Sequence, residues 1–586
     1  MSTYHAPIEE MLFVMNEIGD LNEIAGLPGY EDSSPDLVAA ILEEAGKLGS
    51  EVLDSINIIG DQEGCTLENG VVRTPSGFRN AYAQFIEAGW NSMPFDPEFG
   101  GQGLPWLVST GVSEIWHGAN MSFALCPMLT GGAAELLSIH GSSELKNIYL
   151  EKMISGEWTG TMNLTEPQAG SDLAQIRTKA ERDGNAYRIS GQKIYITYGE
   201  HDFTENIIHM VLARTPDAPE GIKGISLFVV PKFLINEDGS LGERNDLRCG
   251  SLEHKLGIHA SPTAVMLFGE NEGATGYLVG DENRGIEYMF TMMNNARLTV
   301  GLQGVAIAER AYQRARAFAD ERIQGRDGKT GAKESVAIIN HPDVRRMLLS
   351  MRCQTEAVRT LAYWVASRLD IAKKHKDAPT AKKAKSYVDL LTPIVKAWST
   401  DIGVEVSNTG VQVHGGMGYI EETGAAQHLR DARIAPIYEG TNGIQAIDLA
   451  GRKVARENGE TMKMLIAEMR ASINDMGHPH ARLSKAIDEL ERVTDWIVKT
   501  YVENPVTALA GAVPYLRLAG ITIGGWLMVR VFEASKGLAE SSPLYAKRKQ
   551  SSVSFYARHI LTQVPGLADA VLDGSSVSAD TPPEAV

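Results

Sequence analysis

The chain changes character at one stretch, Met162-Asn163-Leu164-Thr165-Glu166-Pro167-Gln168-Ala169-Gly170-Ser171-Asp172. Before this stretch the spacing of apolar residues is mainly that of helices, and after it short apolar or alternating runs are separated by turn residues, as in strands. Strands this short and this closely spaced favour a small barrel or sandwich. Within the stretch, Pro and Gly are ordinary turn residues, but the hydroxyls and backbone N–H groups could also hold a polar ring edge or a phosphate.

Downstream of this stretch the strand signals continue to about Val279. Asp183-Gly184-Asn185 predicts a turn, and the runs Tyr187-Arg188-Ile189 and Ile194-Tyr195-Ile196 predict a hairpin around Gly191. Four more predicted strands are Ile207 to Ala213, Ile225 to Val230, Ala264 to Phe268 and Tyr277 to Val279.

Helical spacing returns after Gly285. One helix face carries Met289, Met292, Met293, Ala296 and Val300, and core packing is the simplest reading of such a methionine stripe. We therefore expect a mainly α protein with a central β-barrel. The predicted order is an N-terminal helical domain (1–160), the β-barrel domain (161–282), a second helical domain (283–455), a C-terminal helical extension (456–574) and a disordered tail (575–586).

Composition excludes several classes of function. The net charge of −19 disfavours a nucleic-acid backbone as a partner. The most basic segment, residues 373–385, is interrupted by Pro379 and lacks interleaved aromatics, so it reads as a solvated helix face. The four cysteines form no C-x-x-C pair, and no metal or redox motif is expected. No leader is visible, and the apolar run Leu518 to Val529 is too short to span a bilayer, so we expect a soluble cytoplasmic protein without membrane insertion.

Two later stretches could also carry chemistry. Ile437-Tyr438-Glu439-Gly440-Thr441-Asn442-Gly443 places a glutamate after two apolar residues and before a glycine. Burial in a cleft would raise the pKa of this glutamate and make it a stronger base, although a carboxylate near a helix cap fits the pattern equally well. In Gln412-Val413-His414-Gly415-Gly416-Met417-Gly418-Tyr419 the glycines would allow a ligand to approach the backbone closely, but many turns look the same.

Taken together and in this order, these stretches resemble the acyl-CoA dehydrogenase family. The segment Thr165 to Asp172 matches its T-E-P-x-A-G-S-D signature, and Ile437 to Thr441 matches its late I-Y-E-G-T segment. The resemblance runs from about Tyr82 to Lys453. It implies FAD as the cofactor and the family's architecture of a helical domain, a β-barrel and a second helical domain.

The resemblance also assigns roles to individual residues. It makes Glu439 the catalytic base and places Ser171, Arg297 and Gly440 at the acyl-CoA substrate. The residues that it assigns to FAD are Met162, Leu164, Thr165, Ser171, Tyr195, Thr197, Arg322, Gln412, Gly415, Gly416 and Thr441. In the family, the elements that match Arg322 and the segment Gln412 to Gly416 bind the ADP half of a flavin held mainly by the other subunit.

Three positions qualify the resemblance. Tyr195 stands where the family has a tryptophan that packs on the flavin, and His259 stands where an arginine is common. Some members carry the catalytic glutamate one residue before the arginine that matches Arg297, but this chain has Ala296 there. Glu439 is therefore the remaining family-type base.

The implied reaction removes two hydrogens across Cα–Cβ of an acyl-CoA thioester. Glu439 takes the pro-R α-proton, a hydride leaves Cβ for the flavin, and the backbone N–H of Glu439 with a flavin ribityl hydroxyl stabilises the thioester oxygen. Electrons then pass to an electron-transferring flavoprotein, and the enzyme is a homodimer or tetramer. Two alternatives stay open: an acyl-CoA oxidase, and a non-catalytic DNA-binding relative with the same fold.

The ends of the chain narrow the resemblance to one group within the family. The start Tyr4-His5-Ala6-Pro7 and the length of 586 residues are similar to long bacterial members with an extra C-terminal domain. This group includes an enzyme of dimethylsulfoniopropionate breakdown. The expected substrate is therefore a short-chain acyl-CoA, with 3-methylmercaptopropionyl-CoA as one candidate.

Overall fold

The structure is a computed structural model that describes residues 4–328, 334–475 and 481–586. The chain divides into two compact units. Unit 1 comprises Met1–Glu43, Pro105–Glu114 and Arg297–Val586, and unit 2 comprises Glu44–Leu104 and Ile115–Ala296. Three helices run from one unit into the other along the chain: α3 (Pro35–Leu48), α6 (Trp106–Ala119) and α10 (Gly285–Glu321).

Unit 2 contains the strands predicted from the sequence, together with helices from the N-terminal part. Its helices are α4 (Asn57–Glu63), α5 (Phe78–Glu87), α7 (Met121–His140), α8 (Ser143–Leu145) and α9 (Glu151–Ser155). Its strands are β1 (Thr66–Glu68), β2 (Val71–Arg73), β3 (Thr159–Asn163), β4 (Lys179–Asp183), β5 (Ala186–Thr197), β6 (Ile207–Ala213), β7 (Ser226–Pro231), β8 (Phe233–Ile235), β9 (Leu241–Arg244), β10 (Leu247–Leu252), β11 (Thr263–Phe268) and β12 (Ala274–Leu278).

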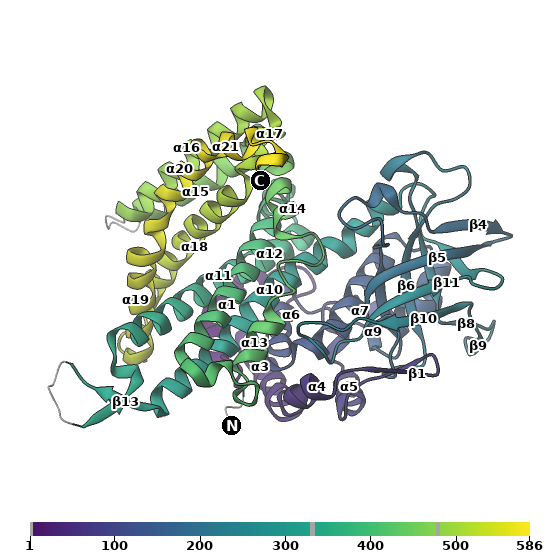
Figure 1. The fold of residues 1–586 in the computed structure, drawn as a ribbon, viewed down its shortest axis with the longest axis horizontal. Helices are drawn as coiled ribbons and strands as arrows, with labels where there is room; N and C mark the ends of the chain where they lie inside the picture. The colour runs from purple at the N-terminus through teal and green to yellow at the C-terminus, as the bar shows by residue number, and fades with distance from the viewer. Residues whose placement is uncertain (1–3, 329–333, 476–480) are drawn as a thin grey trace. The chain divides into compact units, whose positions relative to one another are not determined.

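The main sheet of unit 2 has eight strands in the order β10-β11-β5-β12-β7-β6-β3, with β4 paired to β5. Figure 1 labels β4, β5, β6, β10 and β11 of this sheet. The central β domain is present as expected, but the end strands β10 and β3 do not pair with each other, so its sheet does not close into a barrel. Helix α7 packs against β3, where the Gly160 N–H donates to Thr130 Oγ1 at 3.1 Å. One core of the unit includes Met289, Met292 and Met293, which confirms that this part of the methionine stripe is core packing.

The predicted hairpin around Gly191 is wrong, because β5 continues through this residue as one strand. The first half of β5 pairs with β4 and β12, and the second half pairs with β11. Gly191 has φ 154°, and a Cβ there would lie 2.6 Å from Thr178 Oγ1. The glycine therefore permits a close strand approach inside a long strand, which gives the same sequence signal as a turn.

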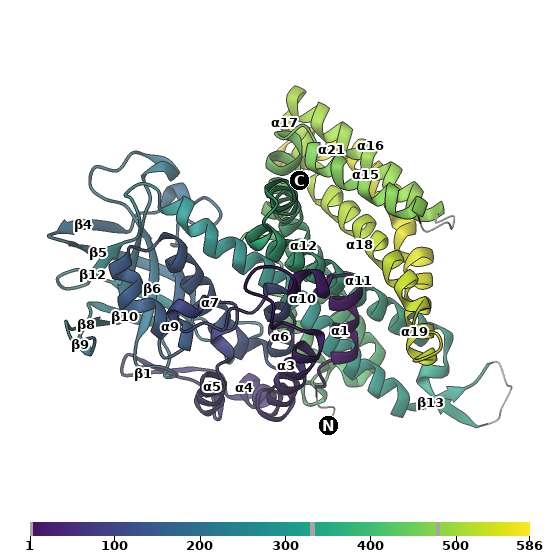
Figure 2. The same ribbon diagram turned by 180° about the vertical axis from the view of Figure 1, so that it is seen from behind.

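Unit 1 is helical apart from a small hairpin. Its elements are α1 (Ile8–Glu17), α2 (Leu21–Ala25), β13 (Ile323–Arg326), β14 (Ser335–Ala337), α11 (Pro342–Lys374), α12 (Ala378–His414), α13 (Ala425–Ala432), α14 (Asn442–Ile447), α15 (Glu460–Asp475), α16 (Ala481–Glu503), α17 (Pro505–Ala510), α18 (Ala512–Lys536), α19 (Pro543–Phe555), α20 (Val564–Leu572) and α21 (Gly574–Asp580). Helix α18 contacts α11 and α20, so the C-terminal extension shares a core with the preceding helices. Figures 1 and 2 both show α18 beside α11.

The end of the chain differs from the disorder expected for residues 575–586. Helix α21 follows α20 and packs on α17. Ser575 is buried and donates through its hydroxyl to Val571 O at 2.6 Å. Packing against a neighbouring helix stabilises a short polar segment that composition alone marks as disordered.

Two helices are long and apolar enough to cross a membrane by length and composition, α7 and α18. Their most apolar windows are 72% and 83% buried inside the protein. Burial of this kind is typical of core helices. The lysines of residues 373–385 are exposed, which agrees with the predicted solvated face.

Candidate active site

The loop that carries Glu439 lies in unit 1, between α13 and α14. Two consecutive residues of this loop have left-handed backbone, Glu439 with φ 46° and Gly440 with φ 73°. The Asn442 N–H donates to Pro436 O at 2.9 Å, and Thr441 caps α14 by accepting from the Ile444 N–H at 3.4 Å. A non-glycine residue in this conformation costs about 1–3 kcal/mol and persists only where its surroundings impose it, most often at functional sites.

Gly440 is required by its surroundings as well as by its φ angle. A Cβ at this position would lie 2.4 Å from Gln445 Nε2, which donates to Gly440 O at 3.3 Å. Within the described parts of the chain, the backbone N–H groups of Glu439 and Gly440 have no hydrogen-bond acceptor. Two donors of this kind side by side are suited to an oxygen that gains negative charge.

Desolvation dominates the electrostatics of Glu439. Its side chain is partly accessible to solvent, yet protein atoms surround enough of it for burial to raise its pKa above the usual range, against the charges of Arg297 and Lys396. Among the residues that the structure describes, none donates a hydrogen bond to its carboxylate. Thr441, rather than Glu439, fills the cap position of α14. These features are typical of a general base.

A polar cluster under the same loop was not predicted from the sequence. Lys396 of α12 is fully buried, and its Nζ donates to Asn442 Oδ1 at 2.9 Å. Asn442 Nδ2 donates to Asp401 Oδ1 at 2.7 Å, and the Tyr438 hydroxyl donates to Gln303 Oε1. The available signal was a lone lysine in the apolar run Leu390 to Trp398, since an unpaired lysine is rarely buried.

The flavin segments named in the sequence analysis lie side by side in unit 2. The loop after β3 carries Thr165, and the Ile194 N–H of β5 donates to Thr165 O at 2.9 Å. The next residue, Tyr195, has φ 60° and leaves 60% of its side chain exposed. The structure thus brings Thr165 and the exposed ring of Tyr195 to one place, while Thr197 pairs with Thr263 of β11.

A buried ion pair holds this loop to β5. Lys193 Nζ contacts Glu166 Oε1 at 2.8 Å and also donates to Leu164 O at 3.0 Å. Burial alone would raise the pKa of Glu166, but Lys193 and the hydrogen-bond donors of Thr178 and Arg177 lower it to about 2. Glu166 is therefore a fixed carboxylate that fastens the loop.

The remaining assigned residues are exposed or lie at element ends. Ser171 is exposed, next to Asp172, which accepts from the Ala174 N–H at 3.1 Å. In unit 1, Phe318 stacks on His414 with ring centroids 4.5 Å apart. This contact joins the end of α10, which precedes Arg322, to the end of α12, which precedes Gly415.

Each unit carries residues that suit one part of a flavin dinucleotide. An exposed aromatic ring beside a polar loop suits a planar heterocycle. Added Cβ atoms at Gly415 and Gly416 would meet no atom within 4 Å, so the backbone there is open to a ligand, and Arg322 and Gln412 beside it are exposed. A guanidinium is suited to a pyrophosphate. Within residues 4–328, 334–475 and 481–586, no group of three His, Cys, Asp or Glu could hold a metal ion.

Four sequence families match successive parts of the chain. These are the acyl-CoA dehydrogenase N-terminal domain over 70–157, the middle domain over 161–270, the C-terminal domain over 283–454, and the acetyl-CoA dehydrogenase C-terminal-like domain over 465–582. The 3-methylmercaptopropionyl-CoA dehydrogenase of Ruegeria pomeroyi is 48% identical over 571 residues, which cover 96% of each chain. The chain belongs to the acyl-CoA dehydrogenase family.

More distant relatives agree in length and fold. A butyryl-CoA dehydrogenase of Syntrophomonas wolfei is 34% identical over 608 residues, with 99% of each chain covered. A Bacillus anthracis acyl-CoA dehydrogenase solved in complex with FAD superposes with a TM-score of 0.74 at 20% identity, over 96% of this chain and 91% of that chain. Because it belongs to the acyl-CoA dehydrogenase family, the protein is an FAD-dependent oxidoreductase, and the C-terminal extension is part of the match.

The structure shows the environment of the two other residues that depart from the family pattern, His259 and Ala296. His259 in unit 2 is held by two carbonyls, with Nδ1 3.0 Å from Asp61 O and Nε2 2.9 Å from Lys255 O. Ala296, at the alternative position for the acyl-CoA dehydrogenase base, is a buried methyl group without acid–base chemistry.

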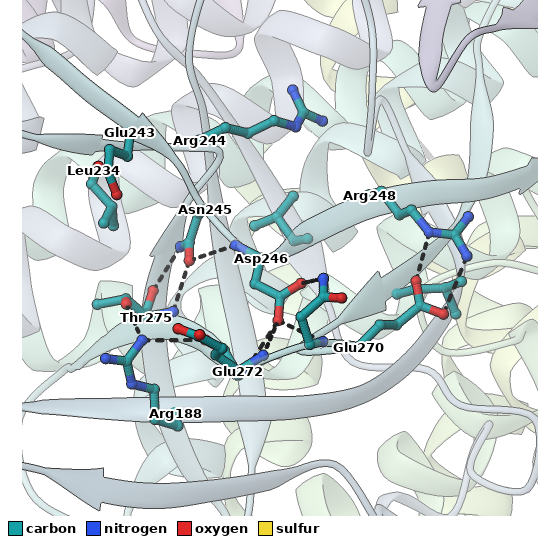
Figure 3. Close-up of a pocket in the computed structure, with 14 residues that line it drawn as sticks. Arg188, Leu234, Glu243, Arg244, Asn245, Asp246, Arg248, Glu270, Glu272 and Thr275 are labelled. Carbon is teal, nitrogen blue, oxygen red and sulfur yellow. Dashed lines mark hydrogen bonds and ion pairs between the residues drawn. The ribbon is translucent and has the colours of Figure 1, made fainter.

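A cavity of about 690 Å³ lies elsewhere in unit 2, among β9 to β12 (Figure 3). Several of its charges are already paired: Arg248 contacts Glu270 at 2.6 Å, and Asp246 accepts from the backbone N–H groups of residues 271–273. None of the residues assigned to FAD or to the acyl-CoA lines this cavity. It is therefore not the candidate active site.

Proposed function

We propose that the chain oxidises a short-chain acyl-CoA to the 2-enoyl-CoA, with Glu439 as the base that takes the α-proton. The observation that carries this proposal is the left-handed loop at Glu439 and Gly440. It joins a carboxylate of raised pKa to two backbone N–H groups that have no acceptor among the described residues. A base beside an oxyanion site is what removal of a proton α to a thioester requires.

Each of these groups has its own role in the proposed reaction. Glu439 accepts the α-proton on a carboxylate oxygen, and Gly440 lets the backbone N–H groups face the thioester oxygen as it gains charge. Arg297 lies close enough to Glu439 to lower its pKa, so it helps to keep part of the Glu439 population ionised. Bound FAD supplies the acceptor for the hydride that leaves Cβ. Proton and hydride together account for the two hydrogens lost.

The same proposal assigns the flavin contacts. Met162, Leu164, Thr165, Tyr195 and Thr197 would hold the ring system, and Thr441 would lie near it. Arg322, Gln412, Gly415 and Gly416 would hold the pyrophosphate and adenosine half, and Ser171 would contact the coenzyme A part of the substrate. The proposed domain boundaries are those given from the sequence up to residue 574. The extension that begins at residue 456 also includes the terminal helix α21.

The substrate proposal rests on the 48% identity to the Ruegeria enzyme named for 3-methylmercaptopropionyl-CoA. We infer that this thioether acyl-CoA or a similarly short acyl-CoA is the substrate. The butyryl-CoA dehydrogenases of similar length also support a short chain. We further propose a cytoplasmic homodimer or tetramer that passes electrons to an electron-transferring flavoprotein.

The test is a dye-reduction assay on FAD-loaded protein with a panel of acyl-CoAs. 3-Methylmercaptopropionyl-CoA and butyryl-CoA should give the highest kcat/KM, and chains of twelve or more carbons the lowest. Activity confined to the long chains would contradict the substrate proposal. Hydrogen peroxide formed under air at the rate of substrate oxidation would instead identify an oxidase.

A further inference from the structure

Lys396 lies directly beneath the loop of the proposed base. It belongs to α12, none of its side chain is exposed, and its Nζ donates to Asn442 Oδ1 at 2.9 Å. Asn442 is three residues after Glu439 and begins α14. One hydrogen bond therefore links a buried cation to the end of the loop that presents Glu439.

Asn442 anchors this loop to α12 through hydrogen bonds. Its Nδ2 donates to Asp401 Oδ1 at 2.7 Å and to Ala397 O at 3.0 Å, and its backbone N–H donates to Pro436 O at 2.9 Å. The amide orientation is consistent, because its oxygen faces the lysine and its nitrogen faces the carboxylate. The left-handed residues 439 and 440 thus lie inside a segment closed at residues 436 and 442.

The charges around Lys396 are unusual for a buried lysine. Burial lowers the pKa of Lys396 to about 7, against the charges of Glu439 and Asp401, while Arg297 of α10 lowers it further. Beyond Asp401 stand Arg517 of α18 and Glu405 of α12. Within the described residues, no ion pair within 4.0 Å joins Lys396 to Glu439, so the lysine acts on the base through space.

We propose that Lys396 is a positioning residue for the base: through Asn442 it fixes the loop, and its positive charge keeps the desolvated Glu439 in the ionised form that accepts a proton. This inference rests on the proposed role of Glu439. The charge of Lys396 sets the direction of the pH dependence. Below pH 7 Lys396 is a cation and favours the Glu439 carboxylate, and well above pH 7 it is neutral and has little effect.

The test compares Lys396→Met with wild type in anaerobic flavin reduction between pH 6 and pH 9. We expect the larger loss at pH 6, up to about tenfold for a rise of one unit in the pKa of Glu439, and a smaller loss at pH 9, where only the hydrogen bond to Asn442 is missing. Lys385→Met is the matched control, because this lysine is exposed on the same helix and pairs with Asp389. An equal loss at every pH would leave Lys396 a merely structural residue and overturn the inference.

A second measurement does not depend on turnover. An infrared titration follows the carboxyl band that is absent from Glu439→Gln, and its midpoint should lie higher in Lys396→Met than in wild type. If the methionine variant does not fold, Lys396→Gln keeps a donor toward Asn442 and removes only the charge. Equal midpoints would refute the role of Lys396. Full turnover by Glu439→Gln would refute the proposed function instead.

Discussion

Each unit contains a buried lysine near a glutamate, and the two arrangements have opposite consequences. In unit 2, Glu166 accepts hydrogen bonds from Lys193, Thr178, Arg177 and Gln168, and its pKa is lowered to about 2. In unit 1, Glu439 accepts none from the described residues, and burial raises its pKa. A buried glutamate near a lysine can therefore hold a loop in place or act as a base. The number of hydrogen-bond donors at its carboxylate decides between the two, because these donors lower its pKa.

The largest effect on stability is expected when the buried ion pair between Lys193 and Glu166 is broken. Lys193→Met leaves the Glu166 carboxylate buried without its cation, and should lower the free energy of unfolding by about 3–5 kcal/mol. Thermal unfolding of the holoenzyme measures this loss. The double variant with Glu166→Gln is the control and should recover part of it, since no uncompensated charge remains. A melting temperature of Lys193→Met equal to that of wild type would contradict the pairing.

The same pair has a defined pH dependence. The pKa of Glu166 is depressed from 4.5 to about 2, so its stabilising contribution is complete above pH 4.5. This contribution is lost as the pH falls toward 2.

A smaller effect is expected from removing Arg322, which is exposed and, among the described residues, belongs to no buried ion pair like that of Lys193 with Glu166. Arg322→Ala should weaken FAD retention by about tenfold to a hundredfold, because a hydrogen bond to a charged group contributes about 1.5–3 kcal/mol. Flavin content after gel filtration and a titration of the apoprotein with FAD measure the change. Arg326→Ala, at the end of the adjoining strand β13, is the control and should bind FAD normally. Full flavin content in Arg322→Ala would remove this residue from the flavin site.

Gly440→Ala tests whether the left-handed loop that carries Glu439 is needed for catalysis. A left-handed alanine costs about 1–2 kcal/mol, and the new methyl group meets Gln445 Nε2. Because the alanine can relieve this strain only by displacing the loop that carries Glu439, we expect kcat to fall about tenfold, equivalent to about 1.4 kcal/mol of transition-state stabilisation. Flavin absorbance should stay near wild type, and the melting temperature should fall slightly. Gly443→Ala is a nearby control, because its Cβ would meet only Thr441 Oγ1, at 3.8 Å. Unchanged kcat in Gly440→Ala would show that the loop conformation is not needed.

The smallest effect is expected at Tyr195, beside the buried ion pair of Lys193 and Glu166. Tyr195→Trp restores the aromatic residue that the family has there, on an exposed site with room for a larger ring. FAD affinity should change by about threefold or less, which corresponds to the lower end of the roughly 0.5–1.5 kcal/mol that an aromatic contact contributes. Quenching of flavin fluorescence on binding measures it. A loss of flavin would mean that the site is shaped specifically for tyrosine.

The sequence predicted the parts of the molecule that depend on local pattern. The order of helices, strands and helices follows from apolar periodicity. The strand Ile207–Ala213 lies at its predicted position, and the Met162–Asp172 stretch opens the sheet region as expected. The motif around Glu439 could be recognised because its chemistry is contiguous in the chain. What these regions share is that neighbours in sequence are also neighbours in space.

The features that could not be predicted depend on distant partners. Gly191 gives the signal of a turn, and only its contact with Thr178 shows why a continuous strand needs a glycine there. The open sheet depends on whether its end strands β10 and β3 pair, which no local pattern reports. The role of Lys396 depends on Asn442, 46 residues further along the chain.

The most direct test is anaerobic single-turnover flavin reduction by 3-methylmercaptopropionyl-CoA or butyryl-CoA, with wild type beside Glu439→Gln. Glutamine keeps the shape of the side chain and the backbone N–H at residue 439, but it cannot accept the α-proton. We expect normal flavin absorbance and acyl-CoA binding in the variant, with reduction slower by at least about a hundredfold, as loss of a general base implies. Reduction within about tenfold of wild type would contradict it, because Glu439 would then not be the base.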